Sequence, residues 1–200
     1  MSLQDTEEVQ RRRLWFAVRV RSHFERVAAA HLRDRGYEPF LPSYKAERRW
    51  SDRIKIVDQF LFPGYVFSRI DPLDRLPIIT VPGVIGLAGF GKTPSPVPDH
   101  EIAHIRTMVE SGLAVSPWPF LQVGQRVLIE RGPLAGVEGI LAEVKGRFRL
   151  VVSISLLQRS VSAEVDRNWV RAAPPPPHSH VPVPPAMQPA GRRAKITSFI

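Results

Sequence analysis

The segment whose residue types would best support chemistry is 86–93, with the sequence GLAGFGKT. This spacing is that of a phosphate-binding loop, in which backbone amides at the start of a helix surround the phosphates of a nucleotide. Here prolines follow at positions 94, 96 and 98, and a helix cannot begin at Lys92 and run through them. We therefore predict a glycine-rich loop without a nucleotide-hydrolysis site.

A second candidate is the pair His100 and His104, which stand one helical turn apart, as zinc ligands often do. Glu101 is the only acidic residue between them, no third ligand is evident, and the chain has no cysteine. These observations favour a solvated helix face over a metal site. No Ser-His-Asp arrangement is evident either. We predict that the protein needs no metal or cofactor.

The composition is that of a globular chain with an excess of positive charge. The 200 residues carry a net charge of +9, and 44% of them are hydrophobic. Such a balance favours a negatively charged partner, either nucleic acid or an acidic protein surface. No apolar run is long enough to span a bilayer, and the N-terminus lacks the apolar core of a signal peptide. With no cysteine, the chain is expected to be cytoplasmic and to avoid membranes.

The elements that would position these residues form two groups. The first group lies at 14–112 and mixes strands with helices, which predicts an α+β domain with an antiparallel sheet. Ser22 and Glu25 have the spacing of a capping box at a helix start. The elements expected are a strand at 14–20, a helix from 22 to 36, an edge strand at 39–44, a projecting hairpin at 45–59, a strand from 65, a short helix from 71, a strand from 84 and a helix from 99 to 112.

The second group lies at 122–172, where five short strands separated by glycine turns predict a small β-barrel. Residues 113–121, with Pro117 and Pro119, are expected to be a stiff linker. Residues 1–13 are expected to be a flexible leader, and the proline-rich basic tail at 173–200 to be disordered.

Two motifs in this order resemble the NusG family of transcription elongation factors. The first is the FPGYVF turn and strand at 62–67, and the second is the GPLAGVEG turn at 132–139. The resemblance covers about Leu14 to Ala172. It implies an N-terminal NGN domain, sandwich-like with an antiparallel sheet, and a C-terminal five-stranded KOW barrel of the SH3-like type. It also implies a non-enzymatic factor for processive elongation and antitermination.

The resemblance implies that the N-terminal domain binds the clamp helices of RNA polymerase through a hydrophobic depression. Its lining here would include Tyr65 and Phe67, with Leu87 and Trp15 as further candidates. Aromatic anchors in a concave apolar patch are typical of binding surfaces. The alternative is that these residues form the domain core, and for Trp15 the two interpretations carry equal weight.

The hairpin is the candidate nucleic-acid contact. Arg48, Arg49 and Trp50 combine charge with a ring that can stack on a base, which would suit non-template DNA or nascent RNA. The alternative is a solvated hairpin without a ligand.

The C-terminal domain has a loop that aligns with the family's partner-binding loop. Leu156, Leu157 and Arg159 match its exposed hydrophobic residue and its arginine, which in the family recruit Rho or a ribosomal protein. Leu157 falls where the general factor often has phenylalanine. Residues 76–79, with the sequence LPII, replace a polar run found in RfaH-type relatives. This departure removes the basis for the second polymerase contact that those relatives make. Leu157 and a likeness to the UpxY type favour a specialised paralogue, with a general NusG as the alternative, acting as a monomer.

An RNA-binding or ribosome-associated KOW protein is the alternative function. Polymerase binding by residues 14–112 without RNA would separate the two. The sequence leaves open the target operon, the recruitment signal and whether the C-terminal domain can switch to a helical form.

Overall fold

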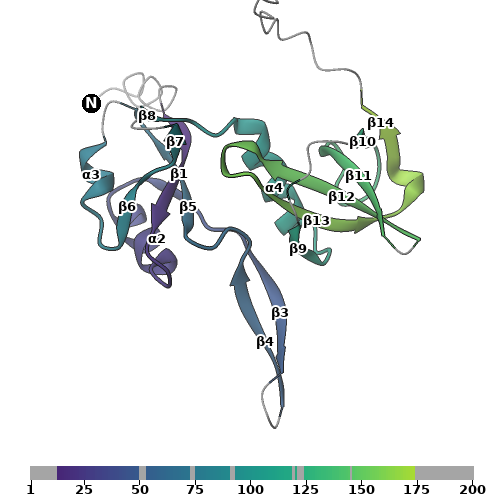
Figure 1. The fold of residues 1–200 in the computed structure, drawn as a ribbon, viewed down its shortest axis with the longest axis horizontal. Coiled ribbons are helices and arrows are strands. Elements are labelled where there is room, and N and C mark those ends of the chain that lie inside the picture. The colour runs from purple at the N-terminus through teal and green to yellow at the C-terminus, as the bar shows by residue number, and fades with distance from the viewer. Residues whose placement is uncertain are drawn as a thin grey trace, which may run out of the picture.

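The computed structural model describes residues 13–49, 53–72, 75–90, 93–118, 120, 124–144 and 146–173. They form two sheet-containing domains that lie side by side, with a long hairpin projecting from the first (Figure 1). The α+β class with antiparallel sheets is confirmed. No helix among these residues is long and apolar enough to cross a membrane.

The first domain is built on a four-stranded antiparallel sheet in the order β2-β5-β1-β6. Strand β1 is nearly continuous in apolar residues because it lies inside the sheet and is covered on both faces. Its register with β5 places Ala17 opposite Phe67 and Val18 opposite Val66. The strands are β1 (Leu14–Val20), β2 (Glu38–Phe40), β5 (Tyr65–Ile70) and β6 (Val84–Leu87).

The helices cover opposite faces of this sheet. Helix α2 (Glu25–Asp34) belongs to the apolar cluster that contains Val18 and Val66. Helix α4 (Asp99–Glu110) belongs to the cluster that contains Trp15 and Phe67. The short helix α3 (Leu76–Ile79) begins a few residues later than the sequence predicted.

The predicted capping box is wrong. Helix α2 begins at Glu25, Phe24 is its N-cap residue, and no side chain caps it. His23 adopts a left-handed conformation (φ 67°), so the chain enters the helix by a tight turn and not through a serine cap. Glu25 has a different partner, the backbone of the turn before β5.

Two hairpins extend from the first domain. Strands β3 (Ser43–Arg49) and β4 (Ile54–Phe60) form the long projecting hairpin that the sequence predicted (Figure 1). Strands β7 (Gly89–Phe90) and β8 (Thr93–Pro94) form a short one. Thr93 lies in strand β8 and the next helix, α4, starts only at Asp99, so no helix begins at Thr93 and runs through the prolines, as predicted. Residues 91 and 92 lie outside those residues.

The second domain is one antiparallel sheet of six strands in the order β14-β10-β11-β12-β13-β9. Five strands were expected. The sixth, β9, comes from the predicted linker, where Ser116 pairs with Ser162 and Pro117 with Val161. Proline is tolerated there because β9 is an edge strand. The strands are β9 (Val115–Trp118), β10 (Gln125–Ile129), β11 (Glu138–Val144), β12 (Arg147–Ile154), β13 (Arg159–Val165) and β14 (Val170–Ala172), with 3-10 turns at Ser155–Leu157 and Arg167–Trp169.

Candidate functional site

The turn before β5 is fixed by contacts from two other elements. Gly64 has a φ of 83°, a conformation that glycine adopts without strain. Its N–H donates to Glu25 Oε1 at 2.9 Å, and its carbonyl accepts from Val20 N at 2.9 Å. Glu25 is only 4% exposed, so a buried carboxylate holds the turn against the start of α2. Tyr65 is therefore presented from a rigid backbone.

The four predicted polymerase-binding residues lie in different environments. Tyr65 is half-buried and leaves part of its ring accessible. Phe67 is 0% exposed and packs against Phe62 and Phe40, with ring centroids 5.3 Å and 6.3 Å away. Trp15 is 4% exposed. Phe67 and Trp15 are thus core residues in this structure.

Leu87 does not join this group. It pairs with Val18 across β6 and β1 and packs in the cluster under α2. Trp15 and Phe67 belong to the cluster on the opposite face of the sheet. Since side chains alternate between the faces of a strand, the register separates Leu87 from them. Leu87 therefore lies on the α2 side of the sheet, and Trp15 and Phe67 lie on the α4 side.

The predicted partner-binding loop lies on the turn itself. Arg159 Nη1 donates to the carbonyl of Pro63 at 2.9 Å, and its guanidinium carbon is 5.2 Å from the centroid of the Tyr65 ring. A cation over an aromatic ring contributes about 0.5–2 kcal/mol. Leu156 and Leu157 are half-buried and pack against the large apolar cluster that includes residues of both domains. The two predicted binding surfaces therefore cover one another.

A second contact between the domains is made by α4. Both carboxylate oxygens of Glu101 accept from the N–H of Ser155, at 3.2 Å and 3.4 Å. Glu101 is buried, which strengthens a hydrogen bond that involves a charge. The N-terminal domain therefore holds both ends of the loop. Glu101 binds Ser155 at its start, and Pro63 binds Arg159 at its end.

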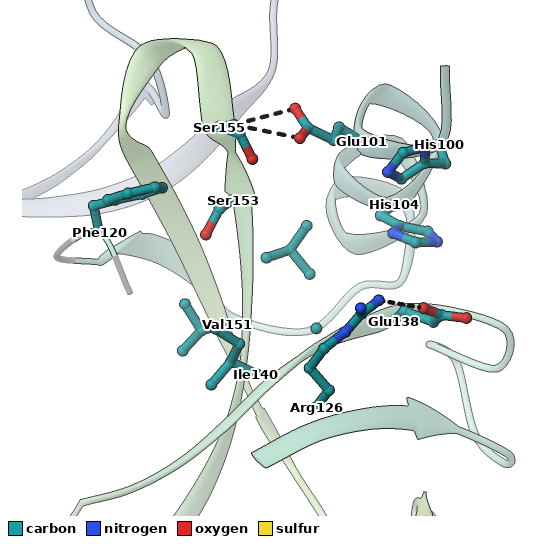
Figure 2. A pocket seen from close by; sticks show the side chains of 12 residues that line it. His100, Glu101, His104, Phe120, Arg126, Glu138, Ile140, Val151, Ser153 and Ser155 are labelled. Carbon is teal, nitrogen blue, oxygen red and sulfur yellow. Dashed lines mark hydrogen bonds and ion pairs between the residues drawn. The ribbon is translucent and has the colours of Figure 1, made fainter. Parts of the chain in front are cut away.

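A cavity of about 460 Å³ lies beside this contact, between α4 and the second sheet (Figure 2). His100 and His104 line one wall, with ring centroids 5.9 Å apart, and the ion pair of Arg126 with Glu138 (3.2 Å) lines another. Burial lowers the pKa of His104, and His100 lowers it further, while Glu138 acts in the opposite direction.

The histidine pair has no metal-binding geometry. No group of three potential metal ligands is present among the described residues. His100 is exposed, in line with the solvated face that was predicted, but His104 faces the cavity between the domains. The pair therefore belongs to the domain junction.

The hairpin brings basic residues to one end of the molecule. Its register places Arg48 opposite Lys55 and Arg49 opposite Ile54. Like charges directly opposite one another destabilise a strand pair unless an anion balances them. Ile54 and Ile56 are 65% and 62% exposed. Trp50, the predicted stacking ring, lies outside the described residues.

Sequence reasoning named Glu25 as part of a cap and Glu101 as an acid between two histidines, but it missed that these buried carboxylates hold the turn and the loop. The apolar faces of helices α2 and α4 could have indicated that these two glutamates are buried. Each glutamate falls on the side of its helix that is buried, where a charge needs a partner. The partners themselves are distant in sequence and could not be inferred.

The chain thus has two domains. The first is a sheet domain that carries the fixed turn before Tyr65 and the projecting hairpin, and the second is a small β domain. A family model described as "Transcription termination factor nusG" matches residues 13–106. A curated relative, the transcription termination/antitermination protein NusG of Buchnera aphidicola, is 32% identical over 175 residues, covering 80% of this chain and 95% of the relative. The chain belongs to the NusG family.

The comparisons also found a more distant curated relative and a solved structure. The NusG protein of Helicobacter pylori is 28% identical over 165 residues, covering 76% of this chain and 93% of that protein. A solved structure titled "Domain interaction in Thermotoga maritima NusG" is 22% identical, with a TM-score of 0.49, covering 80% of this chain and 97% of that one. The relatives are named as transcription termination/antitermination proteins, and the protein is a transcription factor of this general kind.

Proposed function

We propose that the protein is an elongation and antitermination factor that binds RNA polymerase through the Tyr65 turn and recruits a second partner through the Leu156–Arg159 loop. The observation that carries the proposal is the fixed turn. Glu25 and Val20 hold Gly64, so that Tyr65 is presented from a backbone that does not need ordering on binding. An aromatic anchor of this kind contributes a few kcal/mol at an interface.

The domain contact adds a condition to this function. Because Arg159 bonds to Pro63 and covers Tyr65, the polymerase surface and the partner loop cannot both be free while the domains are docked. Polymerase binding would require the second domain to move away, which would also release Leu156 and Leu157 for Rho or a ribosomal protein. A specialised paralogue and a general factor share this condition.

The hairpin would supply the nucleic-acid contact. The hairpin projects away from both domains (Figure 1), where basic residues along it could reach non-template DNA or nascent RNA without disturbing the turn. The protein would act as a monomer, because each proposed surface is complete within one chain. It would work in the cytoplasm, where transcription takes place in bacteria.

The test is retention of core RNA polymerase by the immobilised full chain, in the absence of RNA, compared with Tyr65→Ala. We expect the wild type to retain polymerase and the variant to lose about tenfold or more in affinity, as the loss of an aromatic anchor implies. Phe148→Ala in the second domain, another half-buried aromatic change, is the matched control and should bind normally. Equal binding by all three proteins would refute the role of Tyr65. Binding of ribosomes but not polymerase would favour the ribosome-associated alternative.

A further inference from the structure

A hollow lined by arginines lies on the first domain, away from the domain junction. It has a volume of about 370 Å³ and sits between the C-terminal end of α2, the edge strand β2 and the start of β1. Three arginines from three separate parts of the chain line it. The lining residues are Arg13, Arg33, Gly36, Tyr37, Glu38, Pro39 and Arg69.

Two of the three arginines are held in place by contacts that leave donors available. Arg13 Nη1 donates to Gly36 O at 3.2 Å, and its guanidinium carbon lies 5.6 Å from the centroid of the Tyr37 ring. Arg69 Nη2 donates to Asp99 Oδ2 at 2.9 Å, while its buried Nε has no hydrogen-bond partner in the described part of the chain. A guanidinium group has five N–H donors, so each of these has donors to spare.

The hollow carries an uncompensated positive charge. Asp99 balances Arg69, and Arg106 engages the carboxylate of Glu38 at 3.0 Å. Arg13 and Arg33 have no carboxylate partner within the described residues. Basic residues at a helix C-terminus often serve only to offset its dipole, but that end of a helix is equivalent to about −0.5 of a charge. Two full charges exceed this, so a net charge above +1 remains.

We propose that this hollow binds a phosphate group. Several guanidinium groups that approach from different directions suit a tetrahedral anion with many acceptor oxygens, and arginine is the residue that recognises phosphate through paired N–H donors. The same chemistry is offered by free inorganic phosphate and by a phosphodiester of a nucleic-acid strand. The site is independent of the Tyr65 turn and of the hairpin, since none of its residues belongs to either.

The experiment is a titration of the full chain with inorganic phosphate at low ionic strength, followed by backbone amide NMR shifts. We expect saturable shifts at Gly36 and Glu38, and about tenfold weaker binding in Arg33→Gln, as the loss of a charge-assisted hydrogen bond implies. Arg131→Gln removes one exposed arginine from the second domain and should bind phosphate as the wild type does. Glu38→Gln removes the only carboxylate in the lining and should bind several-fold more tightly, a gain that misfolding could not produce.

A short oligothymidylate distinguishes the two sources. If it shifts the same amides and competes with inorganic phosphate, the hollow takes a backbone phosphodiester. If it leaves them unmoved, the ligand is the free anion. The proposal is overturned if no saturable shift occurs at Gly36 and Glu38, or if Arg33→Gln and Arg131→Gln weaken binding equally. Neither result depends on polymerase binding.

Discussion

Glu25 is the residue on which the candidate site depends most. It is buried and accepts from the N–H of Gly64, which joins the start of α2 to the turn before Tyr65. Leaving a buried donor without a partner costs about 1–3 kcal/mol. The same residue was expected to cap its own helix, so a local pattern was overridden by a partner that is distant in sequence.

We expect Glu25→Ala to lower the free energy of unfolding by about 1–3 kcal/mol, because the N–H of Gly64 would lose its acceptor. Urea unfolding followed by circular dichroism measures this. Glu143→Ala, at an exposed position of β11, should change stability by less than about 0.5 kcal/mol. If the two variants unfold at the same urea concentration, the turn does not depend on Glu25.

His104 gives the protein a pH dependence that can be assigned to one side chain. Its pKa is lowered from 6.5, chiefly by burial and then by His100, so the proton binds more weakly in the folded protein than in the unfolded one. Stability is therefore fully present above about pH 6.5 and is lost as the pH falls through the lowered pKa.

We expect the Tm of the wild type to fall more between about pH 7.5 and pH 5.5 than the Tm of His104→Gln, which cannot take up the proton. Thermal unfolding at the two pH values measures the difference. His31→Gln, on helix α2, is the control, and its Tm should change with pH as the wild-type Tm does. A slope that stays the same in His104→Gln would mean that another group is responsible.

At the scale of elements, the projecting hairpin places two positively charged residues opposite one another. Arg48 lies opposite Lys55 in the register of β3 and β4. Like charges in such a pair destabilise the sheet, and opposite charges contribute about 0.2–1 kcal/mol. A two-stranded hairpin is at most marginally stable alone, so the proposed nucleic-acid contact predicts that changes at this pair affect binding and stability in opposite directions.

We expect Arg48→Glu to stabilise the protein slightly, by at most about 1 kcal/mol, while it weakens binding to single-stranded DNA. The slope of log affinity against log salt should fall by about 1 for each phosphate that the variant no longer neutralises. Fluorescence anisotropy at several salt concentrations gives this slope. Arg131→Glu carries the same change of charge in the second domain. Identical losses of affinity in the two variants would show that only net charge matters.

The elements were largely predictable, and their partners were not. Apolar periodicity indicated β1, α4 and the hairpin, because burial of one face leaves its pattern in the sequence. The edge strand β9 was missed because Pro117 and Pro119 suggested a linker. The separation of Leu87 from Trp15 and Phe67 could not be predicted, because register, which sets the face of each side chain, is not contained in any single strand.

At the scale of the whole molecule, the two domains are held by polar contacts beside a shared apolar cluster. The bond from Arg159 to Pro63 joins positions that are 96 apart in sequence, and no local pattern could have predicted it. What the family resemblance presented as two independent surfaces is, in this structure, one interface. Under the proposed function, the strength of this interface sets the fraction of molecules that can bind either partner.

The most direct test of this account is the affinity of core RNA polymerase for the wild type and for Arg159→Gln. If binding requires an open state, the measured dissociation constant is the intrinsic one divided by the open fraction. Removal of a hydrogen bond and a ring contact should raise that fraction and tighten binding by up to about tenfold. Arg147→Gln, at the exposed first position of β12 in the second domain, should leave the affinity unchanged. Weaker or unchanged binding by Arg159→Gln would contradict the claim that the loop covers the polymerase-binding turn.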